Sequence, residues 1–465
     1  MTLFTCQISG IYVALTFCTI MAIQTIHMQR IYLDNAATTP LDSEVKQAME
    51  PYFGDTYGNP NSLHWFGQQA RAAVDRARET IASAIGARFR EVIFTGSATE
   101  ANNLAIRGAI MHARETFNKI ADGRPMKVIV STIEHDSILA AVRDLEKEGV
   151  EVVRIPVDEH GFVDVQKLEA ALDERTVLVS IMYANNEIGS IQPIKEIANI
   201  LKKFREREHA LPYYPLLHTD AVQAFQFLDC TVDELGVDLM TLSAHKIYGP
   251  KGIGALYART MNTVMHAKDD RVHMIRPRVS GGGQEFGMRS GTENVAAIAG
   301  FAKAVELAGT YRANESKRLA ELRERLWRRI KDFYPIADRN GFSADGILNQ
   351  IPDPESSSGR HDYMSVQDDK EKGRDEMGQS LPNILNVYFP GQKGGDLLIA
   401  LDMRGIAVSS GSACAAFSAK PSHVLMALGF DDARAGGSLR FSFGRHTTQA
   451  DIDGAVEALR AVLRA

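Results

Sequence analysis

The chain has 465 residues, of which 45% are apolar and 24% charged, a composition typical of a globular protein with room for two or so domains. Its formal net charge of −6, from 52 basic and 58 acidic residues, argues against direct nucleic-acid binding through bulk electrostatics. Of the four cysteines, only Cys230 and Cys414 follow the N-terminal segment, and no two form a Cys-x-x-Cys pair. We therefore expect neither a disulfide framework nor a stable metal site, and we expect a reducing, cytoplasmic setting.

The first 27 residues form an apolar leader that we expect to lie outside the folded core. The stretch from Leu3 to Ile26 is long enough for a membrane span. Thr, Ser and Gln interrupt it, however, and no Lys or Arg precedes it, so the basic start of a signal peptide is missing. We expect the functional protein to begin at Met28, with residues 1–27 as a misassigned start or a dispensable extension. A membrane anchor is the less favoured alternative.

From about residue 70 to residue 260, strand-like and helix-like segments alternate. After a first strand at 31–33 and a helix at 68–85, buried strands are predicted at 91–95, 127–131, 150–156, 177–183, 215–219, 238–243 and 254–257. This alternation predicts an α/β fold with a mostly parallel sheet covered on both faces, forming a large domain over residues 28–312 whose first residues pack with a smaller domain. Ligands of such sheets bind beyond the carboxyl ends of the strands.

A candidate anion site follows the strand at 91–95. Small and hydroxylated residues from Gly96 to Thr99 stand where that strand gives way to a helix. Small residues let backbone N–H groups approach an anion, and hydroxyls add donors. The same pattern also makes an ordinary helix cap. Ser243 and His245 are candidates to complete an anion cradle.

Two further polar residues follow predicted strands. His135 comes after the strand at 127–131, where a flat ring could stack on a cofactor and shuttle protons, although a structural histidine is the competing interpretation. Asn186 follows the strand at 177–183, where paired asparagines are equally typical of a turn.

Asp220 and Lys246 end two successive strands and stand 26 residues apart. A lysine at the end of a buried strand lies at the rim of a pocket, where its amine can be desolvated and form a Schiff base. An acid at the neighbouring strand end can keep the ring nitrogen of pyridoxal 5′-phosphate (PLP) protonated. Alone, each residue fits a plainer interpretation, a surface lysine or a helix-capping aspartate. Together they favour a PLP site.

The chain changes character after about residue 310. A highly charged helix is predicted at 315–331, followed by a smaller α+β domain over residues 313–465. Within that domain, Gly341 to Ser380 combines low hydrophobicity with dense charge, which predicts a flexible insertion of unknown role.

Cys414 and Arg440 are the candidate functional residues of the smaller domain. Cys414 lies in a loop of small residues at 409–420, where a thiolate would be accessible as a nucleophile; a buried core cysteine is the alternative. Arg440 stands among apolar strand residues, and its planar fork can grip a carboxylate in two places. An intramolecular salt bridge is an equally open interpretation for Arg440.

As a set, these residues resemble the cysteine desulfurases, PLP enzymes of the class V aminotransferase family, and most of all the iron–sulfur cluster assembly type. The matching stretches, in family order, are residues 32–40, 58–62, 98–100, 185–189, 220–223, 243–246, 289–292 and 409–414. The resemblance implies the PLP-dependent transferase fold type I. The chain departs from the family pattern at Gly96-Ser97, where the order is usually reversed, in the insertion at 341–380, and in the apolar residues 415–417.

The resemblance also implies roles around the cofactor ring. Lys246 would be the Schiff-base lysine and Asp220 the partner of the pyridine nitrogen. Gln223 would bond the phenolic oxygen, with Asn186 close by, and His135 would stack on the ring.

For the cofactor phosphate, the resemblance implies a different set of residues. Ala98, Thr99, Ser243 and His245 would hold the phosphate. Thr292 would reach the same phosphate from the other subunit of a homodimer.

For the reaction, the resemblance implies that Arg440, with Asn186, binds the carboxylate of L-cysteine. Lys246 would remove the Cα proton, and the Cys414 thiolate would take the substrate sulfur as a persulfide and release alanine. The sulfur would pass to an acceptor such as a cluster scaffold or a tRNA-thiolation protein. The alternatives are selenocysteine lyase, another class V lyase or aminotransferase, and a catalytically idle dimeric scaffold. The sequence leaves open whether Cys414 transiently ligates an iron–sulfur cluster.

Overall fold

The computed structural model describes residues 30–116, 124–207, 213–262, 271–341, 380–411 and 421–464, and the structural statements below concern these residues. The leader at 1–27, nearly all of the insertion at 341–380 and the thiol of Cys414 lie outside the described residues.

A seven-stranded sheet of order β2-β8-β7-β6-β5-β3-β4 forms the centre of the described chain. Its strands are β2 (Val92–Thr95), β3 (Lys127–Ser131), β4 (Glu151–Ile155), β5 (Thr176–Ser180), β6 (Leu216–Asp220), β7 (Leu239–Ser243) and β8 (Gly254–Ala258). β8 runs antiparallel to both neighbours, and the other pairs are parallel. The predicted α/β class with a mostly parallel sheet is therefore confirmed.

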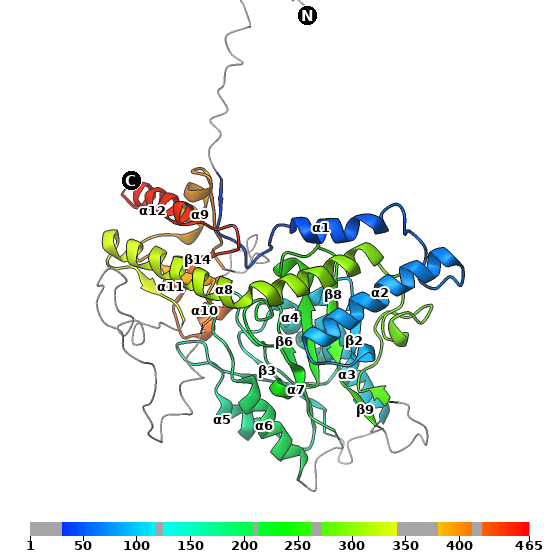
Figure 1. The fold of residues 1–465 in the computed structure, drawn as a ribbon. Helices are drawn as coiled ribbons and strands as arrows, with labels where there is room; N and C mark the ends of the chain where they lie inside the picture. The colour runs from blue at the N-terminus through cyan, green and yellow to red at the C-terminus, as the bar shows by residue number, and fades with distance from the viewer. Residues whose placement is uncertain are drawn as a thin grey trace, which may run out of the picture.

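Helices cover both faces of this sheet (Figure 1). They are α1 (Ser43–Met49), α2 (Trp65–Ala84), α3 (Ala98–Thr116), α4 (Asp136–Lys147), α5 (Val165–Ala171), α6 (Ile194–Arg205), α7 (Val232–Leu235) and α8 (Val295–Phe333). Side chains alternate along each strand, so Val128 and Val130 pack with α3 and α4. Ile129, between them, joins the core formed with α2, α6 and α8. A small antiparallel hairpin, β9 (Thr260–Asn262) with β10 (Arg271–His273), follows β8.

Helix α8 is longer than the sequence predicted. The charged stretch indicated a helix at 315–331, but α8 has 39 residues and begins at Val295, so those predicted bounds are wrong. The helix passes through residue 312, where the boundary between domains was placed, and the division into domains stays a prediction. In Figure 1, α8 runs from the helices beside the sheet to the C-terminal helices.

The C-terminal part holds a second, antiparallel sheet of order β11-β12-β14, from β11 (Asp338–Arg339), β12 (Ile384–Tyr388) and β14 (Ser438–Ser442). Around it are α9 (Gly394–Asp402), α10 (His423–Ala427), α11 (Asp432–Gly436) and α12 (Gln449–Leu463). The first strand of the described chain, β1 (Ile31–Tyr32), pairs in parallel with β13 (Ile406–Ala407). A bridge between Asp34 and Ser442 follows this pair, so the chain that leaves β1 passes beside the end of β14.

Candidate active site

A cavity of about 220 Å³ lies at the carboxyl ends of the parallel strands, between the two sheets. β6 ends at Asp220 and β7 at Ser243, so both side chains enter the cavity, as expected for ligand sites of parallel sheets. The predicted site residues that line it are Ala98, Thr99, His135, Asn186, Asp220, Gln223, Ser243, His245, Lys246 and Arg440. The structure thus brings together residues from both ends of the described chain.

The amine of Lys246 is held by the segment that follows β1. Lys246 ends a single 3-10 turn after β7, and its Nζ donates to the carbonyl oxygens of Ala36 at 2.6 Å and Ala37 at 2.7 Å. The amide Nε2 of Gln223 donates to the same Ala36 carbonyl at 3.0 Å. Lys246 and Gln223 thus share one carbonyl acceptor, which holds both side chains at the same side of the cavity.

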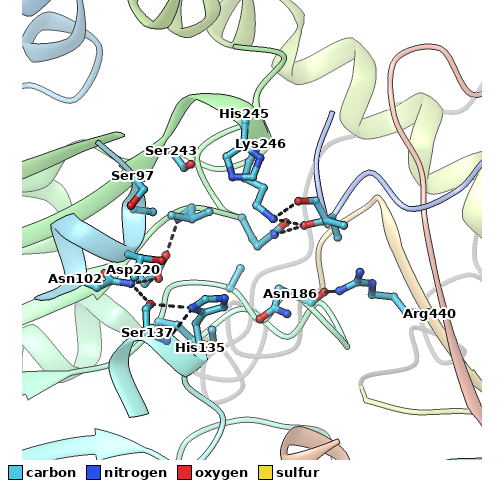
Figure 2. A pocket seen from close by; sticks show the side chains of 18 residues that line it. Ser97, Asn102, His135, Ser137, Asn186, Asp220, Ser243, His245, Lys246 and Arg440 are labelled. Atoms are coloured by element: carbon cyan, nitrogen blue, oxygen red, sulfur yellow. Dashed lines mark hydrogen bonds between the residues drawn. The ribbon is translucent and has the colours of Figure 1, made fainter. Parts of the chain in front are cut away.

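A chain of hydrogen bonds joins Asp220 to His135 (Figure 2). Asn102 uses both amide hydrogens, donating to Asp220 Oδ2 at 2.8 Å and to Ser137 Oγ at 2.9 Å, and all three residues are buried. Ser137 Oγ lies 2.8 Å from His135 Nδ1, and the Ser137 backbone N–H donates to the same nitrogen at 3.1 Å. Because a backbone N–H can only donate, His135 Nδ1 is an acceptor, and the neutral imidazole carries its proton on Nε2.

The N-terminus of α3 closes one end of the cavity. Ser97 Oγ accepts from the Glu100 N–H at 3.1 Å, so the serine caps the helix, and the first-turn N–H groups of Ala98 and Thr99 have no carbonyl partner in the helix. Strand β8 packs tightly against this loop, because a Cβ at Gly254 would come within 2.9 Å of the Ala98 nitrogen. The unusual order Gly96-Ser97 therefore leaves a capped helix N-terminus in place.

Two polar side chains next to Lys246 complete that end of the cavity. Ser243 Oγ is buried and has no hydrogen-bond partner among the described atoms. Burial, helped by the positive charges of Lys246 and Lys251, lowers the pKa of His245 to about 4, so its imidazole is neutral at pH 7. The Nδ1 of His245 lies 3.1 Å from Thr38 Oγ1.

Arg440 lines the opposite end of the cavity and forms the intramolecular salt bridge considered from the sequence. Its Nη2 contacts Asp34 Oδ1 at 2.7 Å, and its Nη1 donates to the backbone oxygen of Asn186 at 2.9 Å. The guanidinium is buried, and its Nε has no partner among the described atoms. The salt bridge does not exclude ligand binding, because the guanidinium also faces the cavity.

Two predicted site residues remain: Thr292 lies elsewhere, and Cys414 is outside the described residues. Thr292 is exposed and lines a separate cavity of about 250 Å³ with Phe53 and Tyr57. Cys414 is outside the described residues, but the chain on both sides of residues 412–420 lies near Glu187. Glu187 Oε2 accepts from Ser422 Oγ at 2.5 Å, and a Cβ added at Gly411 would lie 3.4 Å from the same oxygen.

Sequence reasoning missed Asn102, Ser137 and Asp34. Asn102 stands four residues after Ala98, on the same face of α3, so helical spacing offered a signal. Ser137 follows His135 by two residues, the spacing of a side-chain turn. Nothing local marks Asp34 as the partner of Arg440, because 406 residues separate them in the chain.

Residues 31–339 and 364–454 match the class V aminotransferase family, and the chain belongs to that family. It is 41% identical over 435 residues to the cysteine desulfurase IscS of Dictyoglomus turgidum, covering 94% of this chain and 95% of that one. A NifS-like protein of known structure is 33% identical with a TM-score of 0.75, over 94% of this chain and 99% of that chain. The structure of SspA in complex with cysteine is 32% identical with a TM-score of 0.67, over 90% and 100% of the two chains.

The cofactor of this family is PLP, and the cavity fits it. One end offers first-turn amides of α3 and the Ser243 hydroxyl, which no described atom engages, and both suit a phosphate. The carboxylate of Asp220 suits a pyridine nitrogen, and the Lys246 amine suits an aldehyde. Within the described ranges, no helix is long and apolar enough to cross a membrane, and no three His, Cys, Asp or Glu side chains are grouped to hold a metal ion.

Proposed function

We propose that the chain is a cysteine desulfurase, a sulfurtransferase that converts L-cysteine to L-alanine and leaves the sulfur as a persulfide on Cys414. The observation that carries this proposal is one cavity containing Lys246, Asp220 and Arg440, in a chain that aligns over 94% of its length with a cysteine desulfurase. The first two side chains suit a PLP site, and the third suits an amino-acid carboxylate.

Different residues around the ring would remove the substrate proton and keep the ring nitrogen protonated. When bound, PLP supplies an electron sink for the pair released as a Cα–H bond breaks. Lys246 would hold the cofactor covalently and then, as a free amine, take the Cα proton. Asp220, itself held by Asn102, would keep the ring nitrogen protonated. Gln223 would bond the phenolic oxygen, and His135 would stack on the ring.

The phosphate would lie at the other end of the cavity. Ala98 and Thr99 would bind it through first-turn amides, and His245 through its neutral ring. Ser243 would bind it through its hydroxyl, which has no partner among the described residues. A neutral His245 donates a hydrogen bond without adding a charge, so the positive end of α3 would supply most of the electrostatic attraction.

Arg440 and Asn186 would orient the substrate. The Arg440 guanidinium would receive the substrate carboxylate, which fixes the Cα–H bond relative to Lys246. The Cys414 thiolate would then attack the substrate sulfur. An S–S bond forms as the C–S bond breaks, and the carbon keeps the electron pair, gains a proton and becomes the methyl group of alanine.

The protein would work as a homodimer. Large apolar side chains cluster exposed on residues 53–66, including Leu63 at 91% exposure and Phe53 at 71%. An exposed group of this kind on a globular chain is typical of an interface. Phe53 and Thr292 line the same cavity, which supports the expectation that Thr292 reaches the partner subunit's phosphate site.

The persulfide sulfur would pass to an acceptor protein, such as an iron–sulfur cluster scaffold or a tRNA-thiolation protein. Cys414 can attack the substrate sulfur only as a free thiolate, so we place the protein in the reducing cytoplasm, where thiols are not oxidised to disulfides. The buried free thiol of Cys230 is consistent with this setting.

The proposal is tested by giving purified protein L-cysteine and a reductant, then measuring sulfide and alanine. We expect Cys414→Ser to keep the cofactor's visible absorbance and lose sulfide production. Lys246→Ala should lose the covalent attachment of PLP. Undiminished sulfide release from Cys414→Ser would defeat the persulfide mechanism.

A further inference from the structure

A strained segment follows the hairpin of β9 and β10. Glu285 and Phe286 have φ angles of +49° and +58°, in the left-handed region that non-glycine residues seldom adopt. Such backbone angles are unfavourable for residues that carry a Cβ, so the surroundings must hold both residues in place.

Arg78, on α2, holds this segment. It offers Nη1 and Nη2 to the two carboxylate oxygens of Glu285 at 2.6 and 2.8 Å, with both side chains buried. Its guanidinium also lies 4.8 Å from the ring centres of Phe94 and Phe286. The backbone that leads into Arg289 is therefore fixed to the large sheet.

Arg289 leaves this fixed segment and meets α3. Its Nε donates to Glu100 Oε1 at 2.8 Å, and its Nη2 lies 3.4 Å from Glu100 Oε2. Glu100 Oε2 also accepts the Gly96 N–H at 2.8 Å. The ion pair thus lies on the loop whose next residues, Ser97 to Thr99, line the cofactor cavity.

The carboxylate of Glu100 serves two opposed needs. At the first turn of α3 it satisfies an N–H and complements the helix dipole, which stabilises the helix. The same negative charge would repel a phosphate dianion at that helix end. Arg289 resolves the conflict, because it cancels the charge without removing the hydrogen bond to Gly96.

We propose that Arg289 is a positioning residue for the cofactor phosphate: it neutralises Glu100, so that the N-terminus of α3 keeps its affinity for a dianion. The inference rests on the phosphate placement in the proposed function. Arg289 itself acts through Glu100 and does not line the cavity.

The test compares two ligands that differ only in the phosphate. The full-length protein, stripped of cofactor, is titrated with PLP and with pyridoxal, and binding is followed by absorbance. We expect Arg289→Gln to weaken PLP binding about three- to tenfold, the range of a single uncompensated charge near a helix end. Pyridoxal carries no phosphate, so its binding should stay within about twofold of the original protein. A twofold change corresponds to less than about 0.5 kcal/mol.

The matched variants are Glu100→Gln and the double variant Glu100→Gln with Arg289→Gln. Glu100→Gln alone should bind PLP at least as tightly as the original protein, and the double variant should recover the affinity lost by Arg289→Gln. Arg289→Lys, which keeps the charge, should retain most of the affinity.

Two results would overturn the inference. If Arg289→Gln weakens pyridoxal and PLP equally, the arginine has only a structural role. If the double variant stays as weak as Arg289→Gln, the arginine does not act by neutralising Glu100. An original protein that binds pyridoxal and PLP equally would instead contradict the phosphate placement in the proposed function.

Discussion

Replacing Arg440 with lysine tests the substrate site directly. The guanidinium already holds Asp34 through Nη2 and the Asn186 carbonyl through Nη1, and its Nε has no partner in the part of the chain that the structure describes. A lysine keeps the positive charge beside Asp34 but has a single ammonium group, which cannot also grip a substrate carboxylate with a planar fork.

The size of the effect follows from the bonds that are lost. A hydrogen bond to a charged group is worth about 1.5–3 kcal/mol, and about 1.4 kcal/mol corresponds to a tenfold change in rate. We therefore expect Arg440→Lys to lower kcat/KM for L-cysteine about 10- to 150-fold. Alanine is the less useful replacement, because an unpaired Asp34 next to a buried gap could cost about 3–5 kcal/mol of folding free energy.

The assay is steady-state alanine formation, with the cofactor's absorbance confirming that the variant is loaded. The loss should appear mainly in KM, because the carboxylate is bound before and during the reaction. Asp34→Asn is the matched control: it removes the intramolecular anion that competes for the guanidinium, and KM should fall. An Arg440→Lys variant with unchanged kcat/KM would refute the assignment and leave the salt bridge as the whole role of Arg440.

Two other predictions concern groups behind the site. Burial lowers the pKa of His218 to about 4 and raises that of Glu134 to about 8. Between pH 6.5 and 4 the unfolded chain binds more protons at His218 than the folded chain does. The contribution of His218 to the free energy of unfolding is therefore lost as pH falls through that window, by up to about 1.4 kcal/mol per pH unit. At Glu134 the folded chain binds more protons than the unfolded chain between pH 4.5 and 8. The contribution of Glu134 to the free energy of unfolding is therefore lost as pH rises through that window. The two contributions oppose one another where their windows overlap, so each is measured as a difference from the original protein in denaturant unfolding across pH 4 to 8. The stability difference for His218→Gln should change between pH 4 and 6.5, and that for Glu134→Gln between pH 4.5 and 8. Differences that do not vary with pH would contradict the burial argument. Asn102→Ala should lower kcat about tenfold or more with little change in KM, because Asp220 loses a hydrogen bond worth about 1.5–3 kcal/mol. Ser137→Ala keeps that bond and should cost less; equal losses would show that Asn102 does not act through Asp220.

The strands of the large sheet other than the edge strand β4 could be predicted because they are buried on both faces and form short apolar runs in the sequence. Asp220 and Ser243 then had to lie at one edge, since parallel strands share a carboxyl end. The direction of β8 was not predicted. Ten residues separate Ser243 from Gly254, fewer than the crossover that a parallel pair needs. The short connection between β7 and β8 therefore indicated an antiparallel pair.

Contacts between segments far apart in the chain could not be predicted from the sequence. Arg440 among apolar residues predicted that a carboxylate was near, yet only the pairing of β1 with β13 and the bridge to β14 bring Asp34 to it. The start of α8 was missed for another reason. Its first half is rich in alanine and buried, whereas its second half is charged, so a change of composition was interpreted as a change of element.

Helix α8 sets, by its length, the distance between the two parts of the chain that it contacts. It contacts α1 and α2 at one end and α12 and β12 at the other. At 1.5 Å per residue, its 39 residues span about 58 Å without a break. Deleting one residue near its middle would turn everything beyond it by about 100° and draw it in by about 1.5 Å. Such a deletion would displace β14, and with it Arg440, from a lysine held on the other sheet. Substitutions on its exposed face leave that spacing unchanged, so the helix must conserve its length more strictly than its side chains.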